Sequence, residues 1–461
     1  MKRREFLATL AAPVLLGGCK GLFNIGYASP RRVNPSDRVN LAIIGCGTQA
    51  YDNVNQFLQD PRAQITLVCD PVTHAETGYS YDAKRPGGCI PFKNKIDEWY
   101  KNKSCRMTND WREVVSDPTI DAVVICTPDH WHAIIGIAAM KAGKHVYCQK
   151  PLTLSIEEGI VMTRVAKETG VTFQTGNQGR SSSAKRVACE LVRSGYIGEC
   201  KYCFIGIPGG SGGAWGHPAV TERGKIPSYF NEDTWNLWQG PAEHWENNAF
   251  IHGIHEPMAW RWNRRYGNGM IADFSPHELD TLQWALGMET SGPVAIENCK
   301  FGNWQPDRSV FSWAGEYEFD LVYANGFRAH VVSMREGVPR GLQFKGSKGE
   351  LKNINGSLEL PPELRKWNEK RDLKDTDVHL YKPKDGHSHE SDFLDGIYEQ
   401  RQVNSTCEIG HRTNTLAQLA NICQRLGLSG AKWDPVAERF VGNDAANKLL
   451  SVDYHNGWKL I

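Results

Sequence analysis

The segment VNLAIIGCGTQA, residues 39–50, restricts the fold more than any other part of the chain. It begins with an apolar run suited to a strand buried on both faces in a parallel sheet. Gly45 and Gly47 then introduce a GxGxxA turn that leads into a helical pattern. Such glycines permit a tight turn and let the backbone approach a pyrophosphate at the start of the helix. Glycine turns between a strand and a helix are also common without a ligand, so the motif depends on its context. With the strand that follows, it predicts a dinucleotide-binding fold, with Thr48 and Gln49 beside the two glycines at the phosphates.

A carboxylate at the end of the next apolar run indicates which dinucleotide the turn would bind. The run ITLVCD ends at Asp70, where this fold puts an acid that accepts hydrogen bonds from the adenosine ribose. A carboxylate there would repel a 2′-phosphate, so we expect NAD in preference to NADP. The alternative is that Asp70 is a helix cap or a turn residue.

Alternating strand and helix patterns follow and predict a doubly wound parallel sheet. Residues 74–109, rich in Gly, Lys, Tyr and Pro, look like an insertion over the edge of the cofactor site. The strands expected after it are 121–128, 144–148 and 171–176, and the helices are 131–142 and 155–169. Repeated βαβ units place ligands at the carboxyl ends of their strands.

Polar residues gather at three of these strand ends, which the fold brings to one crevice. Lys150 follows a strand at the place of an active-site lysine, and Pro151 keeps the preceding backbone extended so that the side chain projects forward. The alternative for this lysine is a surface position at a strand end. The residues that we expect at the cofactor from these ends are Thr127, Pro128, His132, Gln149, Lys150 and Asn177.

The pattern changes after residue 177 to short alternating strands with one packed face. The stretch 310–334 alternates in this way, and Asn325-Gly326 within it is a hairpin signal. We therefore expect two domains. Residues 39–177 form a Rossmann-like doubly wound parallel sheet, and residues 178–461 form an α+β domain on a mostly antiparallel open sheet.

Four short motifs give the chain a resemblance to a known family. They are GCGTQA at 45–50, CTPDHWH at 126–132, CQKP at 148–151 and DFSPHELD at 273–280. With them, the chain from about residue 38 onward resembles the glucose–fructose oxidoreductase/inositol dehydrogenase (Gfo/Idh/MocA) family. The resemblance implies a dinucleotide-binding domain followed by a mostly antiparallel sheet, whose face often forms an oligomer interface, so we expect a homo-oligomer. The family's usual tripeptide is Glu-Lys-Pro, and Gln149 replaces the glutamate here.

The resemblance implies Lys150, Asp273 and His277 as the catalytic set. Oxidation of a secondary alcohol needs a base for the hydroxyl proton while a hydride leaves carbon. A histidine suits the base role because its pKa lies near neutrality. The lysine would stabilise the developing alkoxide, and the aspartate would orient the imidazole or bind a neighbouring hydroxyl. Because Pro276 begins a helical pattern, we expect a loop to aim both Asp273 and His277 into the crevice.

An aromatic segment, residues 206–265, is the expected substrate region. Tryptophan faces stack on the C–H face of a sugar, and histidine or arginine binds hydroxyls or a carboxylate. The residues that we assign to the substrate are His255, Trp260, Arg261 and Asp280. Asp280 suits a salt bridge equally well, and most of the tryptophans suit a core or an interface. We expect no metal, because His252 with His255 and His387 with His389 lack a further acidic or histidine partner at a readable spacing.

Residues 1–19 have the order of an export signal. Arg3 and Arg4 precede a short apolar stretch, and LGGC ends at Cys19, which resembles a twin-arginine signal joined to a lipoprotein cleavage box. The alternative is a buried N-terminal helix. Residues 20–38 then form a tether, and we expect a periplasmic protein or one anchored to the membrane only by a lipid on Cys19. Twin-arginine export carries folded proteins, so the NAD should be tightly bound.

Charge and site together limit the function classes. The 53 basic and 52 acidic residues offer no overall attraction to nucleic acid or an anionic membrane. Our first hypothesis is hydride transfer between a tightly bound nicotinamide cofactor and a hydroxyl of a carbohydrate or cyclic polyol. The second is an NAD-dependent glycosidase or lyase that transiently oxidises the sugar at C3. The third is a binding protein that keeps a cofactor fold without turnover.

Overall fold

Six parallel strands form the N-terminal sheet in the computed structural model. The structure describes residues 32, 34 and 37–460, except 78, 80–84, 209–226, 244–258, 303–311, 334–336, 365–372, 383 and 385. The strands follow the order β3-β2-β1-β4-β5-β6. They are β1 (Val39–Ile44), β2 (Ala63–Cys69), β3 (Arg106–Thr108), β4 (Ala122–Ile125), β5 (His145–Gln149) and β6 (Phe173–Gly176). The change of direction in strand order lies between β1 and β4, where doubly wound folds bind ligands.

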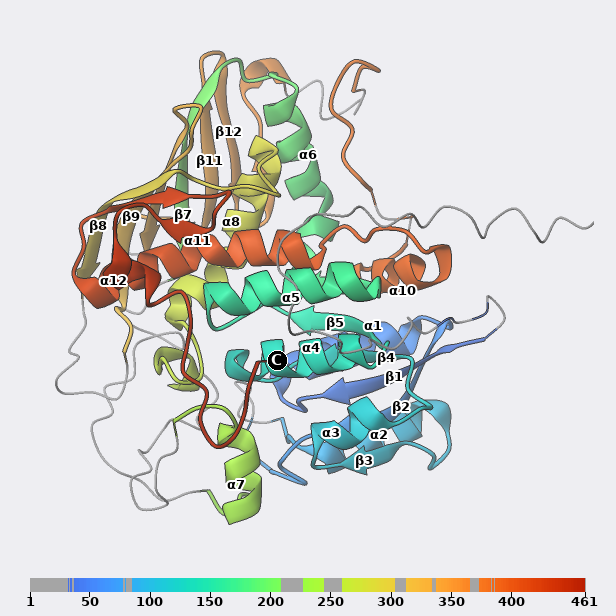
Figure 1. The fold of residues 1–461 in the computed structure, drawn as a ribbon. Coiled ribbons are helices and arrows are strands. Elements are labelled where there is room, and N and C mark those ends of the chain that lie inside the picture. Colours follow the sequence, from blue (N-terminus) through green and yellow to red (C-terminus); the bar gives the residue numbers. More distant parts are fainter. Residues whose placement is uncertain are drawn as a thin grey trace, which may run out of the picture.

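Helices cover both faces of this sheet, as its apolar strands require (Figure 1). They are α1 (Thr48–Gln59), α2 (Cys89–Tyr100), α3 (Trp111–Ser116), α4 (Asp129–Lys141) and α5 (Ile156–Thr169). One core joins the sheet to α4 and α5, and a second joins it to α1 and α2. The prediction of an insertion at 74–109 was wrong in part, because α2 and the edge strand β3 lie within that range and complete the sheet.

The second sheet has nine strands in the order β13-β12-β11-β7-β10-β9-β8-β14-β15. The strands are β7 (Cys200–Ile207), β8 (Ala295–Gly302), β9 (Glu316–Val322), β10 (Arg328–Ser333), β11 (Gly341–Gly346), β12 (Gly349–Ile354), β13 (Ser357–Glu359), β14 (Ala431–Asp434) and β15 (Arg439–Phe440). Among the strand pairs of this sheet that the structure describes, only β7 with β10 is parallel. The predicted fold class is therefore confirmed, and so is the hairpin at Asn325-Gly326, which joins the antiparallel strands β9 and β10.

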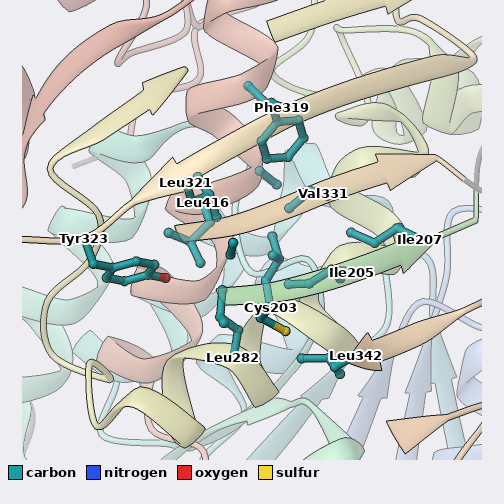
Figure 2. Close-up of a cluster of buried hydrophobic side chains, with 14 of the residues drawn as sticks. Cys203, Ile205, Ile207, Leu282, Phe319, Leu321, Tyr323, Val331, Leu342 and Leu416 are labelled. Atoms are coloured by element: carbon teal, nitrogen blue, oxygen red, sulfur yellow. The ribbon is translucent and has the colours of Figure 1, made fainter. Parts of the chain in front are cut away.

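Three long helices pack on one face of the nine-stranded sheet. They are α6 (Ser183–Arg193), α8 (Gly269–Leu286) and α11 (Cys407–Leu426). Figure 2 shows the core between these helices and the sheet. Ile205 on β7, Phe319 on β9 and Val331 on β10 point to the helices there. Leu282 of α8 and Leu416 of α11 belong to the same core. The remaining elements are α7 (Glu232–Gln239), α10 (His389–Glu399), α12 (Asp444–Asn447) and the short helices η1 (Gln178–Ser181), η2 (Ala259–Trp262) and η3 (Pro362–Leu364).

The two halves of the chain share helices across their boundary. α5 of the first half lies beside α11 of the second (Figure 1). α10 packs on α1, where Phe393 meets Phe57 at a ring-centroid distance of 6.3 Å. An ion pair between Arg62 and Asp395 also fixes α10 to the N-terminal sheet, with 2.5 Å between nitrogen and oxygen. Among the described residues, no helix combines the length and apolar character that crossing a bilayer requires.

Candidate active site

A cavity opens at the carboxyl ends of β1, β2, β4 and β5, where the strand order predicts a ligand. It contains about 1180 Å³ of empty space, including the part open to solvent. The predicted residues that line it are Gly45, Gly47, Thr48, Gln49, Asp70, Thr127, Pro128, Gln149, Lys150, Trp260, Arg261 and Asp273. The fold therefore brings most of the sequence-predicted set together from both halves of the chain.

The glycine turn between β1 and α1 forms one end of this cavity. Gly45 has φ +92°, and a Cβ added there would lie 2.6 Å from the carbonyl carbon of Cys126. A Cβ on Gly47 would meet nothing closer than the Tyr79 carbonyl oxygen at 3.9 Å. The N-cap residue of α1 is Gly47, which has no side chain to cap the helix. The turn therefore offers an open cradle and a helix start whose first amide groups suit a phosphate, so these residues fit a dinucleotide.

Asp70 lies at the end of β2, as the sequence predicts for a ribose-binding acid. One carboxylate oxygen accepts the Cys46 amide at 2.7 Å, and the other accepts the Val72 amide at 2.8 Å and the Tyr79 hydroxyl at 2.7 Å. Burial raises the pKa of Asp70 to about 6, against the lowering effect of these hydrogen bonds. Asp70 therefore also orders the glycine turn. This agrees in part with the alternative interpretation of Asp70 as a turn residue.

Lys150 meets Asp273 at the other end of the cavity. The Lys150 Nζ donates to the Asp273 carbonyl oxygen at 2.7 Å and to its Oδ1 at 3.3 Å. The Arg261 Nε lies 3.1 Å from the same Oδ1, and its guanidinium stacks over Trp260 at 4.3 Å from the ring centroid. Burial alone would raise the pKa of Asp273, but Arg261 and Lys150 lower it to about 2. Asp273 is therefore ionised between two cations.

Asp273 and His277 both lie on α8, which corrects the prediction of a loop. The helix runs from Gly269 through Pro276 to Leu286, so residues 273 and 277 are one turn apart on one face. Burial, and then the charges of Lys150, Lys185 and Arg340, lower the pKa of His277 well below its usual value. The imidazole is therefore neutral, as a proton acceptor must be. His277 itself is not among the residues that line the cavity.

The helix continues through Pro276 because tertiary packing supports it. Proline lacks the amide hydrogen of a normal helical residue, so the sequence alone predicts a helix start there. α8 is, however, buried against α6, α11 and the nine-stranded sheet. The Asn177 side-chain amide adds a hydrogen bond to the Pro276 carbonyl oxygen at 3.2 Å.

Two residues predicted at the cofactor lie behind the cavity instead. The ring nitrogens of His132 lie 2.9 Å from the Pro151 carbonyl oxygen and 2.8 Å from that of Thr127, and the side chain is buried. His132 therefore holds two cavity-lining strand ends together. Asn177 is buried against α8. Neither side chain lines the cavity, so their assignment as direct cofactor contacts is corrected to positioning.

Gln149, which replaces the usual glutamate, joins a buried polar network. Its Nε2 donates to Asn53 Oδ1 at 2.8 Å, and Asn53 Nδ2 donates to Glu390 at 2.9 Å. The Tyr147 hydroxyl donates to the same Glu390 oxygen at 3.1 Å. A carboxylate is thus present near this strand end, but it comes from α10 in the C-terminal part of the chain.

The substrate residues predicted from the sequence have different outcomes. Trp260 and Arg261 line the cavity beside Asp273. The salt-bridge alternative holds for Asp280. Its carboxylate accepts a hydrogen bond from Arg180 Nε at 2.8 Å. The residue is 1% exposed and does not line the cavity. Its assignment to the substrate was therefore wrong. His255 lies outside the described residues.

The structure adds cavity-lining residues that the predicted set omits. Asp129 begins α4, lines the cavity and is buried. Burial, and then the charge of Asp273, raise the pKa of Asp129 well above its usual value. Trp131 and Trp238 also line the cavity, whereas Trp262 is buried in a core, as expected for most tryptophans of its segment. The strand-end motif CTPDHWH was the available signal for Asp129.

This fold and site define a two-domain, dinucleotide-binding class of protein. A family model described as the NAD-binding Rossmann fold of the Gfo/Idh/MocA oxidoreductases matches residues 39–177. A second model, the C-terminal alpha/beta domain of the same oxidoreductases, matches residues 189–460. The chain belongs to the Gfo/Idh/MocA oxidoreductase family.

Several relatives have names that describe sugar or polyol dehydrogenases. Levoglucosan dehydrogenase of Pseudarthrobacter phenanthrenivorans is 26% identical over 206 residues, 44% of this chain and 42% of the relative. The scyllo-inositol 2-dehydrogenase (NAD(+)) of Bacillus subtilis is 32% identical over 268 residues, 57% of this chain and 59% of the relative. The matched part of the chain thus spans about half the length of these relatives. A solved levoglucosan dehydrogenase in complex with NADH and levoglucosan shares the fold, with a TM-score of 0.56, 18% identity and coverage of 86% of this chain and 99% of the other.

Proposed function

We propose that this protein is an NAD-dependent oxidoreductase that transfers a hydride between its cofactor and a hydroxyl of a carbohydrate or cyclic polyol. One observation carries the proposal. Lys150, at the end of β5, contacts Asp273 of α8 in the same cavity that the open glycine turn lines. The relatives described above bear dehydrogenase names, so the glycosidase alternative is not favoured.

The residues divide the chemistry between them. His277, kept neutral by its surroundings and one helical turn from Asp273, is the proposed acceptor of the hydroxyl proton, although its side chain does not line the cavity in this structure. The Lys150 ammonium stabilises the negative charge that develops on the substrate oxygen. Asp273 holds Lys150 and Arg261 in place through its ion pairs. Trp260 and Arg261 provide an aromatic face and a cation for a hydroxylated ring.

The cofactor end of the cavity suits NAD. When bound, the nicotinamide supplies the hydride acceptor for an alcohol or the donor for a ketone. Gly45, Gly47 and the start of α1 would hold the pyrophosphate, and Asp70 would accept hydrogen bonds from the ribose. The Asp70 carboxylate opposes a 2′-phosphate, which supports NAD over NADP.

Export and assembly are further parts of the proposal. We propose that residues 1–19 direct export to the periplasm with NAD already bound, that Cys19 carries a lipid, and that the protein assembles as a homo-oligomer. Support for export comes from the order of Arg3, Arg4 and Cys19 in the sequence. Replacing both arginines by lysine should retain the protein in the cytoplasm. Mass analysis of the exported chain and size-exclusion chromatography test the lipid and the assembly.

One experiment tests the central proposal. The exported protein is purified without added cofactor, and its bound nucleotide is identified by mass spectrometry before and after incubation with sugars and polyols. Lasting reduction of NAD by one substrate class supports the dehydrogenase. Return of NAD to its starting state with release of an aglycone would support the glycosidase instead. A chain that neither contains nor takes up a nicotinamide cofactor overturns both.

A further inference from the structure

The C-terminal segment, residues 454–458, returns to the dinucleotide-binding domain after the nine-stranded sheet is complete. Figure 1 shows the chain leaving α12 and ending beside α4. The Tyr454 hydroxyl donates to Glu158 on α5 at 2.7 Å. The segment lies far along the chain from the residues that line the cofactor cavity. Its contacts connect it to the cavity wall.

The polar groups of the segment bind the chain that follows α7. The His455 amide donates to the Pro241 carbonyl oxygen at 3.0 Å. Asn456 Nδ2 donates to the carbonyl oxygens of Gly240 and Ala242 at 2.8 and 2.9 Å. Three consecutive carbonyl groups at the end of α7 are thus held by two residues of the C-terminal segment.

The aromatic group of the segment supports two other parts of the wall. The Trp458 ring packs edge-on against Trp131 of α4 at 4.9 Å between centroids, and lies 5.8 Å from Trp111 of α3. The Arg112 guanidinium covers Trp458 at 5.5 Å. Trp111 and Trp131 both line the cofactor cavity, so Trp458 supports them from behind.

These supported parts also bind one another. The Trp131 Nε1 donates to the Trp238 carbonyl oxygen at 3.1 Å, and His130 Nε2 lies 3.0 Å from the same oxygen. Gly240 lies against the Trp131 ring, where a Cβ would come within 2.0 Å of a ring carbon. Trp238 lines the cavity as well. The side of the cavity formed by α3, α4 and α7 is therefore one connected wall, and the C-terminal segment fastens it.

We propose that the C-terminal segment retains the bound dinucleotide, with Asn456 and Trp458 as positioning residues that keep the cavity wall closed. This inference rests on the proposed NAD-binding function and deepens it. A cofactor leaves a cleft of this kind when a wall moves. Besides the contacts of the C-terminal segment, an apolar core that joins Trp235 and Trp238 of α7 to Val72 of the first domain also holds this wall. Fastening the wall slows release, which a protein exported with its cofactor requires. The expected effect is on the dissociation rate of NAD.

The test compares NAD release from Trp458→Ala, Asn456→Gly and the unaltered protein. Glycine at 456 removes the two side-chain hydrogen bonds and tolerates the left-handed φ of +59° found there. Trp99→Ala is the control, because Trp99 lies on α2 and is 53% exposed. Each protein is loaded with labelled NAD and chased with unlabelled NAD. We expect release to accelerate about tenfold or more in the two variants and less than about twofold in the control.

Thermal melting of the cofactor-free proteins separates retention from folding. Retention is supported when the variants melt as the unaltered protein does and release NAD faster. The inference is overturned when the unaltered protein binds NAD and both folded variants release NAD at the rate of the unaltered protein. If Trp458→Ala fails to fold, Asn456→Gly decides the outcome. If the unaltered protein binds no NAD, the proposed function fails rather than this inference alone.

Discussion

Lys150 and Asp273 form a direct contact between the end of β5 and the buried helix α8. The lysine nitrogen lies 2.7 Å from the aspartate carbonyl oxygen and 3.3 Å from its carboxylate. This contact joins the dinucleotide-binding domain to the domain that carries His277. It places a cation and an ionised carboxylate one helical turn from the imidazole of His277, which the proposed proton transfer would use as its base.

Substitution of Lys150 should affect turnover more than cofactor binding. Lys150→Met removes the cation that stabilises the developing alkoxide, so we expect kcat to fall about 10²- to 10³-fold. Steady-state kinetics with the substrate found by the cofactor experiment provide the measurement, and Lys348→Met, at an exposed position, is the control. A kcat within twofold of the unaltered protein would remove Lys150 from the chemistry.

The pH dependence of turnover should reflect the lowered pKa of His277. Protonation inactivates a base. Burial, and then the charges of the nearby cations, lower the pKa of His277, so the imidazole takes up a proton only at lower pH. We therefore expect no loss of kcat from this group between about pH 8 and pH 6. His277→Gln should lower kcat about 10²- to 10⁴-fold. His379→Gln, at an exposed position, is the control.

Substitution of Lys185 should shift the pH dependence of kcat in a defined direction. Its ammonium group donates to the His277 carbonyl oxygen and lowers the pKa of the imidazole. Lys185→Met removes a positive charge, so the imidazole should accept a proton at higher pH, and the acidic limit of kcat should move upward. A shift in the opposite direction would contradict His277 as the base.

Cofactor choice should depend on Asp70. Asp70→Ala removes a charged acceptor, and hydrogen bonds to charged groups contribute about 1.5 to 3 kcal/mol each, so NAD affinity should fall about tenfold or more. The preference for NAD over NADP should narrow at the same time, because the repulsion of a 2′-phosphate disappears. Calorimetric titration with both nucleotides measures the two effects, and Asp52→Ala, exposed on α1, is the control. An unchanged preference would assign Asp70 to turn structure alone.

The two glycines of the turn should fail in different ways. Gly45→Ala forces a Cβ to 2.6 Å from the Cys126 carbonyl carbon at φ +92°, so we expect about 1 to 3 kcal/mol lower stability. Gly47→Ala meets no contact closer than 3.9 Å and should melt normally, but its methyl group enters the phosphate cradle and should weaken NAD binding. Denaturant unfolding and NAD titration of both variants measure the difference. Normal NAD binding by Gly47→Ala would place the pyrophosphate elsewhere.

The buried pair of Asp280 with Arg180 should matter for stability. Asp280→Asn removes the negative charge that pairs with Arg180, which is only 3% exposed. Breaking a buried ion pair lowers the free energy of unfolding by about 3 to 5 kcal/mol. Glu289, which also pairs with Arg180 at 2.8 Å, should keep the loss near the lower end. Asp375→Asn, at an exposed position, is the control for urea unfolding. A stable Asp280→Asn variant with a raised KM would restore Asp280 to the substrate site.

Sequence alone determined the parts of this protein that depend on local pattern. The apolar run before Gly45, the spacing of the glycines and the position of Asp70 predict β1, the turn and the end of β2, because strand burial and backbone freedom are properties of neighbouring residues. Alternation around Asn325-Gly326 predicts the hairpin for the same reason. The strand-end motifs place Lys150 in the cavity, since parallel strands end at a common edge.

Tertiary structure decided what depends on residues far apart in the chain. Only packing on α6, α11 and the second sheet shows that α8 passes through Pro276 and puts Asp273 and His277 on one face. Only the approach of Arg180 commits Asp280 to an ion pair. Trp458, near the C-terminus, packs against Trp131 of the first domain. No local pattern encodes these contacts, because burial and electrostatic interaction depend on distance in space rather than on separation along the chain.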